Sequence, residues 1–203
     1  MPHRIRGTGM RATRLPKSQR VLLLVDFISA LDFPGAEKLA GPALAAARAT
    51  AELKRRLAAE GVTAIYANDN YGVWQSDFHS LVSHCLGLPG EAGEIARLLY
   101  PQASDLTILK PRHSAFYASP LELLLAEMDT RELVLCGLAT DMCVQLTAAD
   151  AFLREYKVWV PADCTAAESE RSKAAALDYM ASVLKCEVHP STERPSAGAA
   201  AKN

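Results

Sequence analysis

The sequence has no long hydrophobic run and no excess of charge of either sign. No apolar stretch approaches the roughly 18 residues that a membrane-spanning helix requires, so we expect no membrane segment. The 22 basic and 23 acidic residues leave a formal net charge of −1, which gives no field that would attract nucleic acid or an anionic membrane surface. These absences favour an ordinary globular protein that binds neither nucleic acid nor a membrane surface.

The cysteines form no pattern that would indicate a disulfide framework or a structural zinc site. There are five of them, an odd number, and none belongs to a CxxC pair. The first twenty residues, MPHRIRGTGMRATRLPKSQR, carry six basic side chains and lack the apolar core of a secretory signal. We therefore expect a cytoplasmic setting, a basic and flexible extension over 1–19, a single domain over 20–190 and a loose tail over 191–203.

Short apolar runs alternate with helical patterns along the chain. Strands are predicted at 20–27, 62–68, 105–110, 132–137 and 157–163, with a short sixth strand at 186–189. Helices are predicted at 41–60, 76–87, 119–128, 141–155 and 168–184. This alternation indicates right-handed βαβ units, and hence an α/β fold with a parallel sheet covered by helices on both faces.

Three side chains with useful chemistry stand where predicted strands end. Asp26 ends the first strand, Lys110 ends the third, and Cys143 follows the fourth in the first turn of a helix. Each has an ordinary explanation when taken singly: a helix cap, a solvated lysine and a buried core cysteine. Because ligands bind beyond the carboxyl ends of parallel strands, the joint placement favours an acid, a cation and a nucleophile in one site.

The chain resembles the isochorismatase-like cysteine hydrolases over residues 20–188. Four pieces carry the resemblance: LLLVDF around Asp26, YANDNYGVWQSDF at 66–78, ILKPRHSAF around Lys110, and LCGLATDMCVQLTAADA around Cys143. The resemblance implies an Asp–Lys–Cys triad in a three-layer α/β/α sandwich, whose six-stranded, largely parallel sheet has the order 3-2-1-4-5-6. It also implies a cis peptide bond between Leu138 and Ala139, and a homodimer or homotetramer.

The triad suits hydrolysis of a C–N bond. The Cys143 sulfur can attack a carbonyl to give a thioester, while Asp26 takes the thiol proton and later gives it to the leaving amine. Lys110 favours both a thiolate and an ionised Asp26, and the helix start also favours the thiolate, so we expect the pKa of Cys143 to be lowered. The backbone N–H groups of Ala139 and Cys143 are candidates for the oxyanion hole.

We expect neither a cofactor nor a metal. The nicotinamidase branch of the resembled family binds a metal through an acid-x-His pair after the second strand, whereas this loop reads ANDNYG and has no histidine. His84 and His113 complete no recognisable set of ligands. The pocket is expected to be lined instead by Asn68, Asn70, Trp74 and Phe116, although Asx turns and ordinary packing would explain these residues equally well.

Three functions are compatible with these residues. The favoured one is metal-independent cysteine hydrolysis of a small amide, ureido or carbamoyl compound. The first alternative is an isochorismatase-type vinyl-ether hydrolase, which would use Asp26 and need no nucleophilic cysteine. The second is a relative that binds a small molecule without turning it over.

Overall fold

A parallel sheet forms the centre of the molecule. The computed structural model describes residues 14–75 and 77–193, and within them the sheet has six strands. The strands are β1 (Arg20–Val25), β2 (Thr63–Asp69), β3 (Leu106–Lys110), β4 (Glu132–Leu138), β5 (Lys157–Trp159) and β6 (Thr165–Ala166). Their order is β3-β2-β1-β4-β5, and β6 pairs with β4. The predicted fold class is therefore confirmed.

The sixth strand lies elsewhere in the chain than predicted. The segment 186–189 is not a strand, because only Glu187 forms an isolated parallel bridge, to Trp159 at the end of β5. The sixth strand is β6, which pairs with Gly137 and Leu138 of β4, beyond the stretch of β4 that pairs with β5. A strand of two residues is too short to leave a periodic signal in the sequence.

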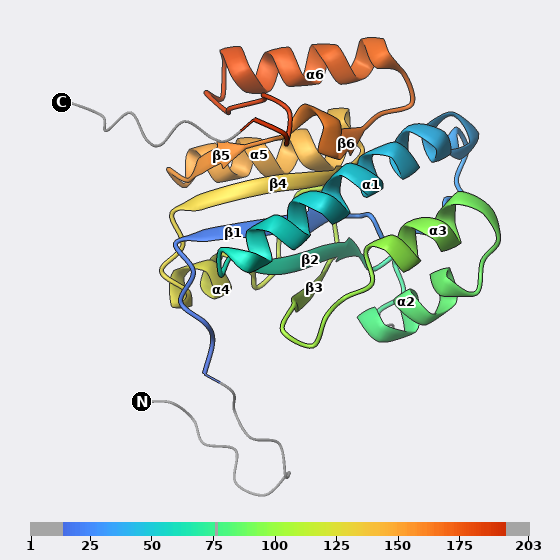
Figure 1. Ribbon diagram of the computed structural model, residues 1–203, viewed down its shortest axis with the longest axis horizontal. Coiled ribbons are helices and arrows are strands. Elements are labelled where there is room, and N and C mark those ends of the chain that lie inside the picture. The colour runs from blue at the N-terminus through green and yellow to red at the C-terminus, as the bar shows by residue number, and fades with distance from the viewer. Residues whose placement is uncertain (1–13, 76, 194–203) are drawn as a thin grey trace, which may run out of the picture.

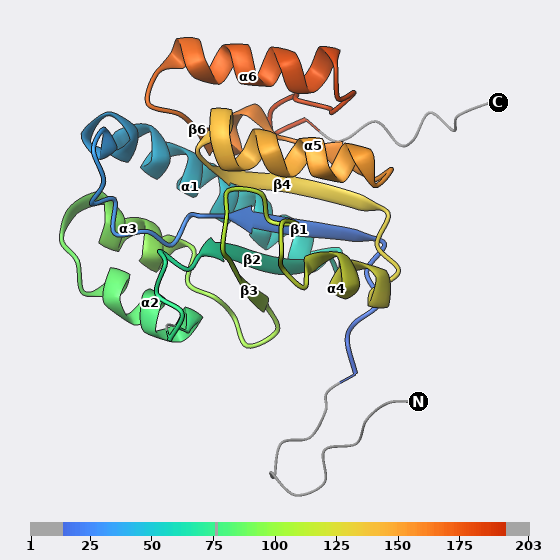
Figure 2. The same cartoon turned by 180° about the vertical axis from the view of Figure 1, so that it is seen from behind.

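Helices cover both faces of the sheet (Figures 1 and 2). One face carries α1 (Ala36–Ala59), α2 (Phe78–Leu86) and α3 (Gly90–Leu98), and the other carries α4 (Leu121–Glu127), α5 (Gln145–Leu153) and α6 (Glu170–Ser182). Alternate residues of β1 belong to two separate hydrophobic clusters, with Leu22 and Leu24 in one and Leu23 in the other. Burial on both faces explains why this strand reads as a continuous apolar run.

Two helices differ from the prediction. The helix expected from residue 41 begins at Ala36 and contains Pro42, whose poor helix propensity concealed the first turns. Helix α3 was not predicted, because Gly90 and Gly93 lower the helical signal of its sequence. Within the described residues, no helix combines the length and the apolar character needed to cross a membrane.

Both segments that flank the predicted domain are partly attached to it. Ser18 is buried, and its backbone N–H donates to Met128 O at 2.9 Å. Ser191 is also buried, and its N–H and hydroxyl donate to the two carboxylate oxygens of Asp163 at 2.7 and 2.6 Å. Ser18 and Ser191, just outside the predicted bounds of 20–190, therefore contact the domain. The rest of each prediction, 1–13 and 194–203, lies outside the described residues.

Candidate active site

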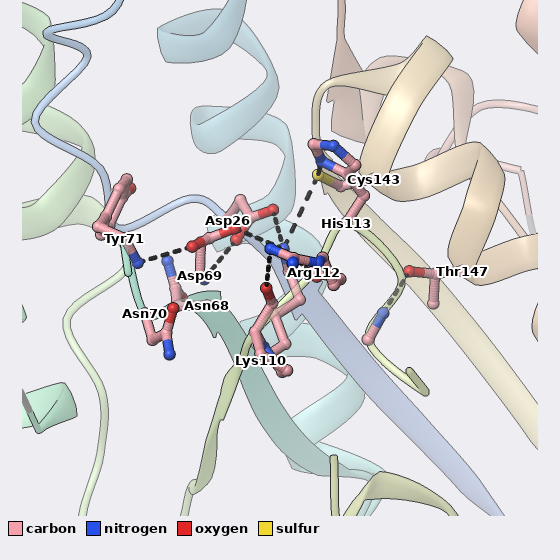
Figure 3. A network of polar contacts seen from close by, with 12 residues as sticks. Asp26, Asn68, Asp69, Asn70, Tyr71, Lys110, Arg112, His113, Cys143 and Thr147 are labelled. Carbon is pink, nitrogen blue, oxygen red and sulfur yellow. Dashed lines mark hydrogen bonds and ion pairs between the residues drawn. The ribbon is translucent and has the colours of Figure 1, made fainter. Parts of the chain in front are cut away.

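The carboxyl ends of β1 and β3 and the turn after β4 bring the three predicted catalytic side chains together (Figure 3). Lys110 Nζ lies 2.7 Å from Asp26 Oδ2 and 3.8 Å from Cys143 Sγ. The Lys110 side chain is fully buried, that of Asp26 is 13% exposed, and Cys143 is 9% exposed. An acid, a cation and a thiol thus form one cluster at the rim of the sheet.

Backbone contacts at the end of β1 hold Asp26 in place. Its N–H donates to Ala67 O at 3.1 Å, and its φ of 53° turns the chain away from the sheet at this residue. Its carboxylate accepts a hydrogen bond from the N–H of Asp69 at 2.8 Å. The neighbouring strand β2 therefore fixes one oxygen of Asp26, and the other faces Lys110.

Asp69 is a second carboxylate at this cluster that was not predicted to be part of the site. Its Oδ2 lies 3.6 Å from Lys110 Nζ, and its Oδ1 accepts from the N–H of Tyr71 at 2.6 Å. Lys110 also donates to Arg112 O at 3.2 Å. Because Asp69 is the last residue of β2, the strand-end argument that selected Asp26 would also have selected it.

The turn that carries Cys143 joins β4 to α5. The peptide bond between Leu138 and Ala139 is cis, as the resemblance implied. Residues Thr140–Val144 form a single π-helical turn, with Val144 N–H donating to Ala139 O at 3.2 Å. Ala139 and Cys143, the two predicted oxyanion-hole residues, both line the same cavity. Both residues therefore contribute to the cavity wall next to the thiol.

Hydroxyl groups brace this turn from β6. The hydroxyl of Thr165 donates to Gly137 O at 2.8 Å and lies 2.8 Å from the hydroxyl of Thr140. Both threonines are fully buried. The short strand β6 therefore contributes to the site by holding the chain on either side of the cis peptide bond, where the nucleophile turn begins.

The buried charges set the protonation of the cluster. Burial raises the pKa of Asp26, although the ion pair with Lys110 opposes this shift. Burial alone would lower the pKa of Lys110, but the Asp26 carboxylate holds the pKa above its usual value. Burial, and then the Asp26 charge, raise the pKa of Cys143. The predicted lowering of the Cys143 pKa is therefore wrong, because burial and the Asp26 charge outweigh the opposing charge of Lys110.

His113 is a further contact of the nucleophile. Its ring lies beside Cys143 (Figure 3), with Nδ1 3.6 Å from Cys143 Sγ, and the residue is exposed and lines the cavity. The sequence indicated only that His113 lacked partners for a metal site. Among the described residues, no group of three or more His, Cys, Asp or Glu side chains is arranged to hold a metal ion.

The cluster opens on a cavity of about 500 Å³, a size that suits a small molecule. Its walls come from the loop after β1, the loop after β2, the nucleophile turn and the start of α6. The residues that line it are Asp26, Ser29, Leu31, Phe33, Leu39, Asp69, Tyr71, His113, Leu138, Ala139, Asp141, Met142, Cys143, Glu168 and Ser172. Cys143 therefore faces a space in which a substrate can reach it.

The four predicted pocket residues do not line this cavity. Asn68 is fully buried and donates to Ile28 O at 2.8 Å, and Asn70 accepts from Gly72 N–H at 2.9 Å in an Asx turn. Phe116 is buried in the hydrophobic cluster beneath α4 and α5. Trp74 is 81% exposed. Asn70 and Phe116 thus have the ordinary roles of an Asx turn and core packing, whereas Asn68 holds the loop after β1 and Trp74 is exposed to solvent.

The chain is similar to known proteins over most of its length. The family model described as "Isochorismatase domain" matches residues 20–192. An uncharacterized isochorismatase family protein of Bacillus subtilis is 34% identical over 174 residues, which are 86% of this chain and 95% of that protein. A ureidoacrylate amidohydrolase of Methylorubrum extorquens is 43% identical over 67 residues, but these are only 33% of this chain and 27% of the relative.

Solved structures share the fold. An N-carbamoylsarcosine amidase from Thermoplasma acidophilum superimposes with a TM-score of 0.62 at 26% identity, over 87% of this chain and 98% of its own. The nicotinamidase of Staphylococcus aureus gives a TM-score of 0.66 at 23% identity, over 85% and 98% of the two chains. With the family model covering nearly all of the described residues, the chain belongs to the isochorismatase family.

Proposed function

We propose that this protein is a cysteine hydrolase that cleaves a C–N bond in a small amide, ureido or carbamoyl compound. The observation that carries the proposal is the contact of Lys110 with both Asp26 and Cys143 at the floor of a cavity. Family membership supports it, as do the relatives whose names describe a carbamoyl amidase and a ureido amidohydrolase. The proposed mechanism needs neither metal nor cofactor.

The first half of the reaction forms a thioester. The Cys143 thiol gives its proton to Asp26 as the sulfur attacks the substrate carbonyl, whose electron pair moves to oxygen. The N–H groups of Ala139 and Cys143 would hold this oxyanion. When the intermediate collapses, the C–N bond breaks and the leaving amine takes the proton from Asp26.

The second half of the reaction releases the acid. Water attacks the thioester carbonyl and gives a proton to Asp26, and the C–S bond then breaks with return of that proton to Cys143. The raised pKa of Cys143 suits this role, because the thiol keeps its proton until a substrate is present. Lys110 keeps Asp26 available as the acceptor, since the ion pair favours the ionised carboxylate.

The vinyl-ether hydrolase is the second candidate. It would use Asp26 as a proton donor, and the raised pKa of this carboxyl group would help it to hold a proton. Cys143 would then have no chemical role. A protein that only binds a small molecule is the third candidate, and it would use the cavity without either step.

The test is hydrolysis of a panel of small amides, ureas and carbamoyl compounds, followed as ammonia release with and without EDTA. Cys143→Ala should abolish release, and intact-mass spectrometry of rapidly quenched wild type should detect an acyl adduct on Cys143. Cys186→Ala removes another buried cysteine, in the core beneath α6, and serves as the control. Activity that survives in Cys143→Ala would contradict the thioester mechanism. Light scattering would test the expected homodimer or homotetramer.

A further inference from the structure

The active-site cavity is lined by more acidic than basic side chains. Asp26, Asp69, Asp141 and Glu168 all contribute to its wall. The opposing cation is Lys110, which is fully buried and already lies 2.7 Å from Asp26. The cavity wall therefore has four carboxylates beside one buried ammonium group, and the surplus of negative charge lies on the surface that a substrate would touch.

Glu168 occupies the place where the fold would otherwise favour a bound anion. A Cβ atom added to Gly35 would lie 2.7 and 2.8 Å from the two carboxylate oxygens of Glu168, so this carboxylate rests against the residue that precedes α1. The start of a helix carries about half a positive charge, which stabilises an anion there. Because the protein's own carboxylate takes this position, it is closed to a substrate carboxylate.

No cation of the described residues neutralises the outer carboxylates. Neither Asp141 nor Glu168 forms an ion pair with a lysine or arginine in the described part of the chain. Arg112 lines a separate surface groove, together with His113, and does not line the cavity. His113 is thus the one basic side chain, among the described residues, on the cavity wall.

Basic residues that neighbour the wall in sequence do not line it. Lys38, Arg171 and Lys173 are each next in sequence to a lining residue, Leu39 or Ser172, but none of them lines the cavity. The remaining wall is apolar near Phe33 and Met142. The cavity therefore offers carboxylates to a charged group and an apolar surface to a short carbon chain.

We infer that the substrate of this site is a small amide or ureido compound that carries a positively charged amine. The inference rests on the proposed function for the identity of the bond cleaved, and on the lining carboxylates for the charge. A substrate that bears a carboxylate would be repelled by Asp141 and Glu168. An uncharged substrate of the same shape would bind more weakly than the amine compound and more tightly than the carboxylate compound.

The charge preference can be measured without knowing the substrate. Cys143 is modified with two methanethiosulfonate reagents of similar size, one with a trimethylammonioethyl group and one with a sulfonatoethyl group. Both deliver their alkylthio group to the cysteine sulfur and release methanesulfinate. The ratio of the two rate constants, read at the Cys143 peptide by mass spectrometry, is divided by the same ratio for 2-mercaptoethanol.

We expect the cationic reagent to be favoured by about ten-fold or more at low ionic strength, with the preference shrinking as salt is added. Glu168→Gln and Asp141→Asn should each lower the ratio. Glu60→Gln removes an exposed carboxylate at the far end of α1 and should leave the ratio unchanged. A wild-type ratio of one or less, or a ratio insensitive to both cavity variants, would overturn the inference.

Three ureido compounds on one four-carbon chain separate the inference from the proposed function. Their far ends carry an ammonium, a hydroxyl or a carboxylate group, and kcat/KM is measured as ammonia release. Fastest hydrolysis of the ammonium compound supports both proposals. Fastest hydrolysis of the carboxylate compound would overturn the charge preference and support the hydrolase. If none is hydrolysed while the reagent ratio stays high, the hydrolase proposal fails on these ureas and the charge preference stands.

Discussion

The floor and the rim of the cavity are held in different ways. The floor, defined as Asp26, Asp69, Lys110 and Cys143, stands at the ends of strands and in the turn after β4, and three of these groups contact Lys110 within 3.8 Å. The rim, defined as Leu31, Phe33, His113, Glu168 and Ser172, comes from loops and from the start of α6. The floor is fixed by sheet register, whereas the rim is fixed by the path of each loop.

This difference assigns separate tasks to the two parts. A buried ion pair holds only where other contacts compensate for the loss of water, and the N–H of Asp69 supplies such a contact to Asp26. The rim has few such constraints, because His113 and Glu168 are exposed. We therefore expect the floor to determine the reaction and the rim to determine which compound undergoes it.

The largest effect is expected at the floor, from Asp26→Asn. The amide keeps the shape of the side chain but cannot accept the Cys143 proton, so kcat/KM should fall by about 10²- to 10⁴-fold. Steady-state kinetics on any substrate identified by ammonia release will measure it. Asp178→Asn, at an exposed position of α6, is the control. Activity within a few-fold of wild type would show that Asp26 is not the proton acceptor.

The next largest effect is on stability, at the strand end beneath the nucleophile turn. Gly137 has a φ of 149°, and a Cβ there would collide with Val25 O on the neighbouring strand. Gly137→Ala should lower the free energy of unfolding by about 1–3 kcal/mol or more, measured by urea denaturation. Gly41→Ala, inside α1 with open space around it, should instead raise that free energy by about 0.5–1 kcal/mol. Equal changes in the free energy of unfolding for the two substitutions would contradict the predicted collision of the Gly137 Cβ with Val25 O.

The direction of the Cys143 pKa shift tests the electrostatic effect of Asp26 and Lys110 on the thiol. Because burial and the Asp26 charge raise this pKa, alkylation of native Cys143 by iodoacetamide should increase only above the usual pH range of a cysteine thiol. Asp26→Asn should move the pH profile down, and Lys110→Ala should move it up. Because folding raises the pKa of Cys143, the contribution of this thiol to the free energy of unfolding is fully present below its unfolded pKa. That contribution is lost as the pH rises through the pKa of the folded state. Site-resolved mass spectrometry across pH gives both profiles, and a wild-type profile below the usual range would refute the raised pKa.

The sequence predicted the floor better than the rim for a physical reason. Parallel strands place their carboxyl ends at one edge, so Asp26 and Lys110 could be brought together from their positions alone. Asp69 obeys the same rule at the end of β2, but its place between two asparagines resembles a turn sequence. The path of a loop leaves no such periodic signal, so Trp74 was assigned to the pocket and Glu168 was not.

The strands and helices divide in the same way into those that the sequence predicts and those that it does not. The strands β1 to β4 were predicted within a few residues of their bounds, and β1, β2 and β4 are buried along most of their length. The strand β6 is recognised only by its pairing with β4, which is a property of the folded chain. Helix α3 begins with glycine and depends on packing against α1 and α2. Elements stabilised by tertiary contacts rather than by local pattern were therefore the ones missed.

A smaller effect is expected where the rim touches the floor, at His113. The replacement His113→Gln removes the ring nitrogen that lies 3.6 Å from Cys143 Sγ. A hydrogen bond of this kind contributes about 0.5–1.5 kcal/mol, so kcat/KM should fall by no more than about ten-fold. The full pH profile of kcat/KM should be compared between the two proteins. A loss of kcat/KM as large as that of Asp26→Asn would show that His113 takes part in the reaction, as the floor residues do.

The smallest effect is expected from Trp74→Ala. Trp74 follows β2 closely in sequence, as a pocket residue would, but it is 81% exposed and does not line the cavity. Exposed substitutions of this kind change stability by less than about 0.5 kcal/mol, and kcat/KM should match that of wild type. Leu153→Ala, at a 75% exposed position of α5, gives the baseline for losing an exposed apolar side chain. If Trp74→Ala raised KM while Leu153→Ala did not, Trp74 would contact the substrate, and the cavity wall would extend along the loop after β2 beyond Tyr71.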